Sequence, residues 1–317
     1  MVKEQEQITI GIDVSQDSLD MAAYPGQQIW KYNNNKHGII KILTKLKTLQ
    51  PKLIVMEATG GLEAPLREAL DKAGLEVAVV NPRRIRDFGR AMGLLAKTDK
   101  LDAKVMAYFA AKIEPPPREA RDAASQQIED LLVRRQQLSD MLVAEKNRIQ
   151  QRKAKVIQIQ IKEHIDWLDT QIEEIDKKLK SSIQDNPELL KKVELYKSMK
   201  GVGDILACKL VAMLPELGVL NQREIAALVG LAPLNRDSGR LRGKRTIWGG
   251  RAMVRKAFYM PVLIAIRFNA VIHELYQRLI ERGKLKKVAI VACMHKMLTI
   301  LNSMAKNNTP FNCALVK

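Results

Sequence analysis

Apolar and polar residues follow strand-like and helical periods over roughly the first third of the chain. Alternating segments rich in Ile and Val predict an antiparallel meander of strands at 7–14, 18–24 and 28–33. Short apolar runs predict buried strands at 52–57 and 76–80. Apolar residues at helical spacing predict helices over 38–49, 62–73 and 99–112. The pattern therefore predicts an α/β domain over residues 1–115, which ends at the prolines 115–117.

The order of these elements is that of the ribonuclease H-like fold, in which the first and fourth strands are neighbours. Asp13 ends the first predicted strand and Glu57 ends the fourth, where an unpaired charge is costly to bury. Asp99 and Asp102 begin a helix three residues apart and so share one face. Alone, each acid has an ordinary explanation as a turn residue or a helix cap. Together they predict one divalent-metal site for phosphodiester chemistry.

The residues available as metal ligands narrow the choice of cation. Cys208, Cys293 and Cys313 are isolated and form no CxxC pair, so zinc-ribbon and disulfide frameworks are excluded and a reducing compartment is indicated. The 4 histidines are equally scattered. Carboxylates alone favour a hard cation, Mg²⁺ or Mn²⁺.

The middle of the chain, residues 116–186, is charged and helical. Apolar residues step by four and three to form a heptad seam, made of Ile161, Ile165, Leu168, Ile172, Ile175 and Leu179. A looser series lies upstream at Ile128, Leu131, Leu138, Leu142 and Ile149. We expect a coiled-coil segment, either a helical hairpin or one interrupted helix, and packed within the chain or between chains.

The sequence of residues 187–317 predicts a mainly α-helical domain, the third segment of the chain. Residues 198–214 read as helix, glycine turn and helix, which resembles a helix-hairpin-helix element; Gly201 and Gly203 would let the backbone approach a DNA phosphate. The alternative is an ordinary corner between two helices.

A net charge of +18 favours a polyanionic partner, nucleic acid before an anionic membrane surface. Aromatic residues make up only 4%, which argues against a base-stacking platform. No signal peptide and no apolar run of the roughly 18 residues that span a bilayer is evident. We therefore expect a soluble cytoplasmic protein that associates with the nucleoid of a prokaryote and not with a membrane.

Basic residues are concentrated between 236 and 256, around Ser238. The predicted nucleic-acid contacts there are Arg236, Arg240, Arg242, Lys244, Arg245 and Arg251. Taken alone, the segment is a phosphate-binding loop in which Ser238 donates a hydrogen bond. A serine nucleophile needs a base or a metal, and no histidine or GxSxG motif accompanies this one.

Three N-terminal stretches, GIDVSQDSLD, VMEATGG and AKTDKLDAK, and the downstream GLAPLNRDSGRLRGKRTIWGGR resemble the DEDD-type insertion-sequence transposases related to the Piv and MooV DNA invertases. The resemblance covers nearly the whole chain. It implies a RuvC-like N-terminal domain in which Asp13, Glu57, Asp99 and Asp102 bind metal. It also implies a C-terminal transposase domain in which Ser238 attacks DNA phosphorus and holds one strand as a phosphoserine.

The same resemblance implies further partners: target and donor double-stranded DNA, a non-coding guide RNA from the element itself, and a homo-oligomer, a dimer or tetramer, in which the two halves meet across subunits. Two other interpretations stay open. One is a RuvC-like metal-dependent junction nuclease in which water attacks and Ser238 only binds phosphate. The other is a non-enzymatic, architectural nucleic-acid-binding protein, against which the four intact acids argue.

Overall fold

The structure is a computed structural model that describes residues 7–26, 28–94, 99–117, 123–151, 154–235, 238, 243 and 245–313. The chain divides into two compact units, Met1–Ala120 and Arg121–Lys317, and each has its own core.

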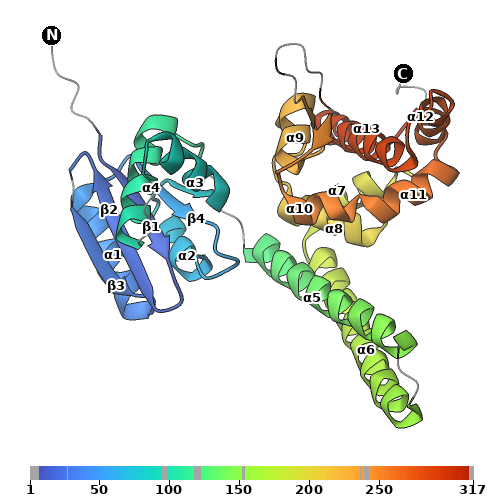
Figure 1. Cartoon of the computed structure of the whole chain (residues 1–317), viewed down its shortest axis with the longest axis horizontal. Helices are drawn as coiled ribbons and strands as arrows, with labels where there is room; N and C mark the ends of the chain where they lie inside the picture. Colours follow the sequence, from blue (N-terminus) through green and yellow to red (C-terminus); the bar gives the residue numbers. More distant parts are fainter. Residues whose placement is uncertain are drawn as a thin grey trace. The chain divides into compact units, whose positions relative to one another are not determined.

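A five-stranded sheet forms the centre of the first unit (Figure 1). In spatial order its strands are β3 (Ile29–Asn33), β2 (Ser18–Tyr24), β1 (Thr9–Val14), β4 (Leu53–Glu57) and β5 (Val77–Val80). The first three pair antiparallel, and β1, β4 and β5 pair parallel. The predicted mixed α/β fold, the meander and the contact between the first and fourth strands are therefore confirmed.

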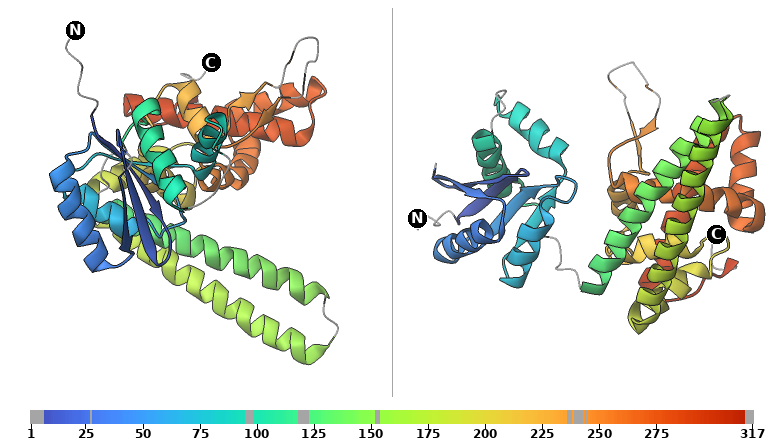
Figure 2. Two further views of the ribbon diagram at one scale, coloured as in Figure 1. Left: turned by 60° about the vertical axis from the view of Figure 1, so that its left-hand side comes forward. Right: turned by 90° about the horizontal axis from the view of Figure 1, so that it is seen from below.

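Helices cover both faces of this sheet (Figure 2). On one face α1 (Lys36–Leu49) and α2 (Ala64–Lys72) share a core with Ile12 and Met56. On the other, α4 (Asp99–Ile113) and α3 (Pro82–Ala91) pack with Val55. Since side chains alternate along a strand, the odd-numbered residues of β1 and β4 lie on the α4 face.

The backbone of α4 lies directly against β1. A Cβ atom on Gly11 would collide with the backbone of Ala103 and Ala107, so only glycine fits there. The Thr9 hydroxyl, two residues earlier on β1, donates to the Ala107 carbonyl at 2.8 Å. Further along α4, Lys112 lies 5.7 Å from the ring of Tyr24, which pairs with Thr9.

These contacts fix the direction of α4. Thr9 contacts Ala107 of α4, whereas Gly11, later in β1, also contacts Ala103, which is earlier in α4. Beyond the end of α4, Glu114 pairs at 2.8 Å with Lys52, which directly precedes β4. The helix therefore runs antiparallel to β1 and β4, and its N-terminus lies at the carboxyl ends of both strands.

Helix α3 was not predicted from the sequence. The helix is short and its apolar face is narrow: only Ile85 and Gly89 are buried, while arginines at 83, 84, 86 and 90 occupy the opposite face. Its start is nevertheless well defined, because the Asn81 side chain caps the amide of Arg83 and Pro82 occupies the first turn.

The second unit begins with two long helices, α5 (Ala123–Gln151) and α6 (Lys155–Gln184), that pack side by side (Figure 1). Of the predicted heptad seam, Leu168, Ile175 and Leu179 are buried in one core with Ile128 and Leu132 of α5. The arrangement is a hairpin, and this part of the seam packs within the chain.

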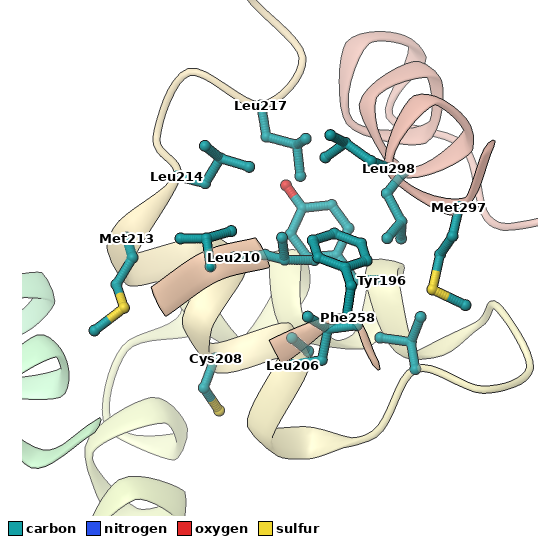
Figure 3. Close-up of a cluster of buried hydrophobic side chains, with 14 of the residues drawn as sticks. Tyr196, Leu206, Cys208, Leu210, Met213, Leu214, Leu217, Phe258, Met297 and Leu298 are labelled. Carbon is teal, nitrogen blue, oxygen red and sulfur yellow. The ribbon is translucent and has the colours of Figure 1, made fainter. Parts of the chain in front are cut away.

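The remaining helices are α7 (Pro187–Lys197), α8 (Asp204–Met213), α9 (Gln222–Val229), α10 (Ala252–Ala257), α11 (Tyr259–Phe268), α12 (Ala270–Glu281) and α13 (Lys286–Asn307). The strands β6 (Pro233–Leu234) and β7 (Thr246–Ile247) form a short antiparallel ribbon. Figure 3 shows part of the core, where Tyr196 and Phe258 lie among Leu206, Leu210 and Leu298.

Helix α13 is the most apolar long helix of the part of the chain that the structure describes. By length and composition it could cross a membrane, although no such segment was anticipated. Most of its apolar stretch is buried within the unit, with Cys293, Met297 and Leu301 fully covered. Its apolar composition is that of a core helix.

Candidate active site

Asp13 and Glu57 lie at matching positions on adjacent parallel strands. The register of β1 with β4 pairs Ile12 with Met56, and each acid is the next residue of its strand. Both side chains are half-buried and belong to the odd-numbered series that faces α4. Neighbouring strands are about 4.8 Å apart, so the backbone brings the two acids together as the sequence predicted.

Asp99 and Asp102 begin the helix that reaches the same end of the sheet. Asp102 is half-buried, and Asp99 is the first residue of α4, although its side chain lies outside the described residues. Asp102 lies one turn before Met106, which packs on the sheet, so it continues the sheet-facing stripe, and the backbone of Asp99 lies one turn before Ala103. Backbone geometry thus places all four acid positions at one corner of the first unit.

A further acid, Asp20, lies beside this group and was missed in the sequence. It is the antiparallel partner of Asp13 and is only 2% exposed. Its Oδ2 accepts from the Ser18 hydroxyl at 3.1 Å and lies 3.4 Å from Nζ of Lys31, its partner on β3. Its Oδ1 is buried and has no hydrogen-bond partner among the described residues. Only its place in GIDVSQDSLD gave a signal.

These oxygens fit a divalent cation in chemistry, because hard cations prefer carboxylate ligands and the buried Oδ1 of Asp20 lacks a donor. Whether enough of these ligands lie close together is a second question. Within the side chains that the structure describes, which leave out Asp99, no three Asp, Glu, His or Cys residues are grouped closely enough to hold a metal. Binding of a cation by Asp13, Glu57, Asp99 and Asp102 stays a prediction.

The loop that follows Glu57 is closed by Glu63. Its Oε2 accepts from the amide and hydroxyl of Thr59, at 3.2 and 2.8 Å, and from the amide of Gly61 at 2.9 Å. Partial burial acts to raise the pKa of Glu63, but these hydrogen bonds outweigh it and the pKa lies below its ordinary value. The carboxylate therefore stays ionised and holds the loop beside the acids.

Ser238 lies in the connection of the β6–β7 ribbon in the second unit, and its side chain is exposed. Arg245, just before β7, is also exposed. Four of the predicted nucleic-acid contacts, Arg236, Arg240, Arg242 and Lys244, lie outside the described residues.

Arg251 has a protein partner that the sequence did not reveal. Its guanidinium makes a bidentate ion pair with Glu216, with one bond of 2.6 Å, and donates to the Met213 carbonyl at 2.9 Å. Nearby, Arg255 donates to the carbonyls of Val229 and Gly249. Two cations of the basic segment thus anchor the base of the ribbon. Contact of Arg251 with nucleic acid stays a prediction.

The two glycines of the turn between α7 and α8 differ in what surrounds them. Gly201 has φ +104°, and a Cβ there would meet Ala265 and the Pro261 carbonyl of α11 at 2.8 and 2.9 Å. Helix packing therefore accounts for Gly201. Gly203 caps α8 and has open space where a Cβ would be. Its role as a phosphate contact stays a prediction.

Comparison with known proteins gives matches to both units. A family model for transposases of the IS110 DEDD type matches residues 10–152, and one described as the transposase IS116/IS110/IS902 family matches residues 193–277. The pilin gene-inverting protein of Moraxella bovis is 27% identical over 96% of this chain and 97% of its own length. The IS900 uncharacterized 42 kDa protein of Mycobacterium paratuberculosis is 29% identical over 46% of this chain and 37% of its own.

Among solved structures, RuvC of Thermus thermophilus resembles 35% of this chain and 98% of its own chain, with 13% identity and a TM-score of 0.26. The family matches together span most of both units and include every predicted acid and Ser238. The chain belongs to the IS116/IS110/IS902 transposase family and is a DNA-recombining enzyme.

Proposed function

We propose that this transposase cuts and rejoins DNA at a divalent-cation site made of Asp13, Glu57, Asp99 and Asp102, with Ser238 as the nucleophile. The observation that carries the proposal is the position of Asp13 and Glu57 at the carboxyl ends of adjacent parallel strands, on the face covered by α4. Mg²⁺ or Mn²⁺ held there would supply Lewis-acid stabilisation of charge on the phosphate.

The protein's own groups have defined tasks in this reaction. The Ser238 oxygen forms a bond to phosphorus, the bond from phosphorus to the 3′ oxygen breaks, and in net terms the serine proton ends on that oxygen. The cut strand is then held as a phosphoserine, which conserves the energy of the bond. A 3′ hydroxyl of another strand reverses the step and joins it, so no ATP is consumed. Basic side chains offset the charge on phosphate.

A covalent adduct tests the serine. Incubation of the protein with Mg²⁺ and a labelled duplex containing a recombination site should give a protease-sensitive protein–DNA adduct. Ser238→Ala should abolish it. Thr246→Val, which removes another exposed hydroxyl of the same ribbon, should retain it. Cleavage and adducts that persist in Ser238→Ala would refute the serine, and cleavage without any adduct would favour the junction nuclease.

We further propose that the enzyme works as a homo-oligomer, a dimer or tetramer, with target and donor DNA and a guide RNA from its own element. The carboxylates and Ser238 belong to different compact units, so one reaction site can draw on two copies of the chain. Nucleic acid that co-purifies with the protein should contain one discrete RNA encoded beside its gene, and a random mixture would contradict guidance. Sedimentation of the complex should give its copy number.

A further inference from the structure

Four strands place a charged residue at the same level of the sheet. Lys31 on β3 pairs with Asp20 on β2, Asp20 pairs with Asp13 on β1, and Glu57 takes the next place on β4. Asp20 faces α4 together with Asp13 and Glu57, because Ala22, two residues along β2, packs against Ala103 and Ala107. The row therefore carries one cation and then three carboxylates.

Asp20 is held in this row by contacts on one side only. Its Oδ2 is taken by Ser18 and Lys31, which lie along β2 and on β3. Its Oδ1 is buried with no partner among the described residues, and the residue opposite Asp20 on β1 is Asp13. A buried carboxylate oxygen without a donor costs free energy, so a missing donor is indicated.

Directly opposite residues of an antiparallel pair have Cβ atoms about 4.5–5.5 Å apart. At that separation the carboxylates of Asp13 and Asp20 are near enough for a cation's water to contact both residues. Asp20 lies one strand further from Glu57 than Asp13 does, and its Oδ2 already has Ser18 and Lys31 as partners, so we place it outside the set of direct ligands.

We propose that Asp20 is a positioning residue of the cation site, whose Oδ1 accepts a hydrogen bond from a water of the cation held by Asp13 and its neighbours. Lys31 offsets the charge of Asp20 and so limits how strongly the row attracts cations. This inference rests on the proposed cation site but concerns a residue outside it. Groups that orient a metal's ligands from outside change metal affinity by about 10–100-fold.

The test is a titration of the full-length protein, without DNA, with Mn²⁺ alone, in which free Mn²⁺ is measured by its electron paramagnetic resonance signal. Asp13→Asn should remove the site. Asp20→Asn should weaken binding by about tenfold or more. Asp17→Asn makes the same charge change at an exposed position of the β1–β2 turn and should leave binding unchanged.

Lys31→Met separates positioning from a merely structural ion pair. Removal of this cation should tighten Mn²⁺ binding severalfold, because like charge near a cation site weakens it. If Asp20 served only as the partner of Lys31, both variants would weaken binding alike, and that result would overturn the proposal. Lys31 is 57% exposed, so its variant should fold even where Asp20→Asn does not, and unchanged binding in Lys31→Met would then count against the proposal.

The outcomes also separate this proposal from the cation site itself. Loss of binding in Asp13→Asn with wild-type binding in Asp20→Asn sinks the role of Asp20 alone. Wild-type binding in Asp13→Asn, or no binding by the unaltered protein, sinks the cation site and the role of Asp20 with it.

Discussion

Asp13 and Glu57 lie on central strands of a sheet covered on both faces, whereas Ser238 lies exposed in the connection of a ribbon whose strands have two residues each. Strand register and the contact of Gly11 with α4 fix the acid positions before any substrate binds. The described anchors of the ribbon, Arg251 and Arg255, hold its base. The difference supports a carboxylate site that is formed before substrate binds, and a proposed nucleophile, Ser238, whose position is set by what it binds.

The largest expected effect is on strand cleavage, from variants of the acids in the first unit. Asp13→Asn or Glu57→Gln should reduce strand cleavage at least about a hundredfold, because each removes a carboxylate that holds the proposed cation. The double variant should be little worse than either single one, since residues of one site are non-additive. DNA affinity, measured by fluorescence anisotropy, should change little. Additive losses would show that the two acids do not share a site.

Gly11→Ala should destabilise the first unit by about 1–3 kcal/mol, the usual cost of overpacking, because the new methyl group meets the α4 backbone. Urea denaturation measures the effect. Gly89→Ala is the matched control, since its methyl group would make an ordinary 3.5 Å contact with Val105 and a helix favours alanine. Equal losses of unfolding free energy in both variants would show that the close β1–α4 contact at Gly11 does not cause the destabilisation.

On the ribbon side, Arg251→Ala should cost about 1–2 kcal/mol of stability. The side chain is 26% exposed and its bonds to Glu216 are charge-assisted, which places it between surface and buried pairs. A double-mutant cycle with Glu216→Gln should give a coupling energy that accounts for most of the loss. A coupling near zero would leave Arg251 available for phosphate.

The smallest effect concerns DNA binding. Arg245→Ala should lower the slope of log affinity against log salt by about one, the value for one lost phosphate contact. Arg251→Ala should leave the slope unchanged, because its guanidinium already has a carboxylate partner. Measurement of binding between about 50 and 200 mM salt separates the two. The reverse order would show that Arg251 exchanges Glu216 for DNA.

Local periodicity was sufficient to predict all five strands and three helices of the first unit, and the positions of Asp13 and Glu57 followed from strand order. Asp20 could not be found in this way. Between the apolar Leu19 and Met21 it has the position of a solvent-facing residue, but the second face of the sheet is covered by α4. An alternating strand does not show by itself whether its polar face is buried. That becomes known only when the element that covers the face is known.

The ribbon escaped prediction for a related reason. Its pairs join Pro233 to Ile247 and Leu234 to Thr246, and neither two-residue strand has a period of its own. The pairing of Arg251 with Glu216 likewise spans 35 residues. The sequence of the basic cluster therefore could not show that one of its cations, Arg251, pairs with an acid from elsewhere in the second unit.

The row across β3, β2, β1 and β4 also bears on when a newly made chain becomes able to cut DNA. A slip of β1 by one residue would turn Asp13 to the face covered by α1 and α2, away from the other acids. Asp13 and Glu57 leave the ribosome well before Asp99 and Asp102, so early fragments hold only half of the proposed carboxylate set. With the proposed site, a chain can therefore cleave DNA only after the sheet and its covering helix are correctly completed.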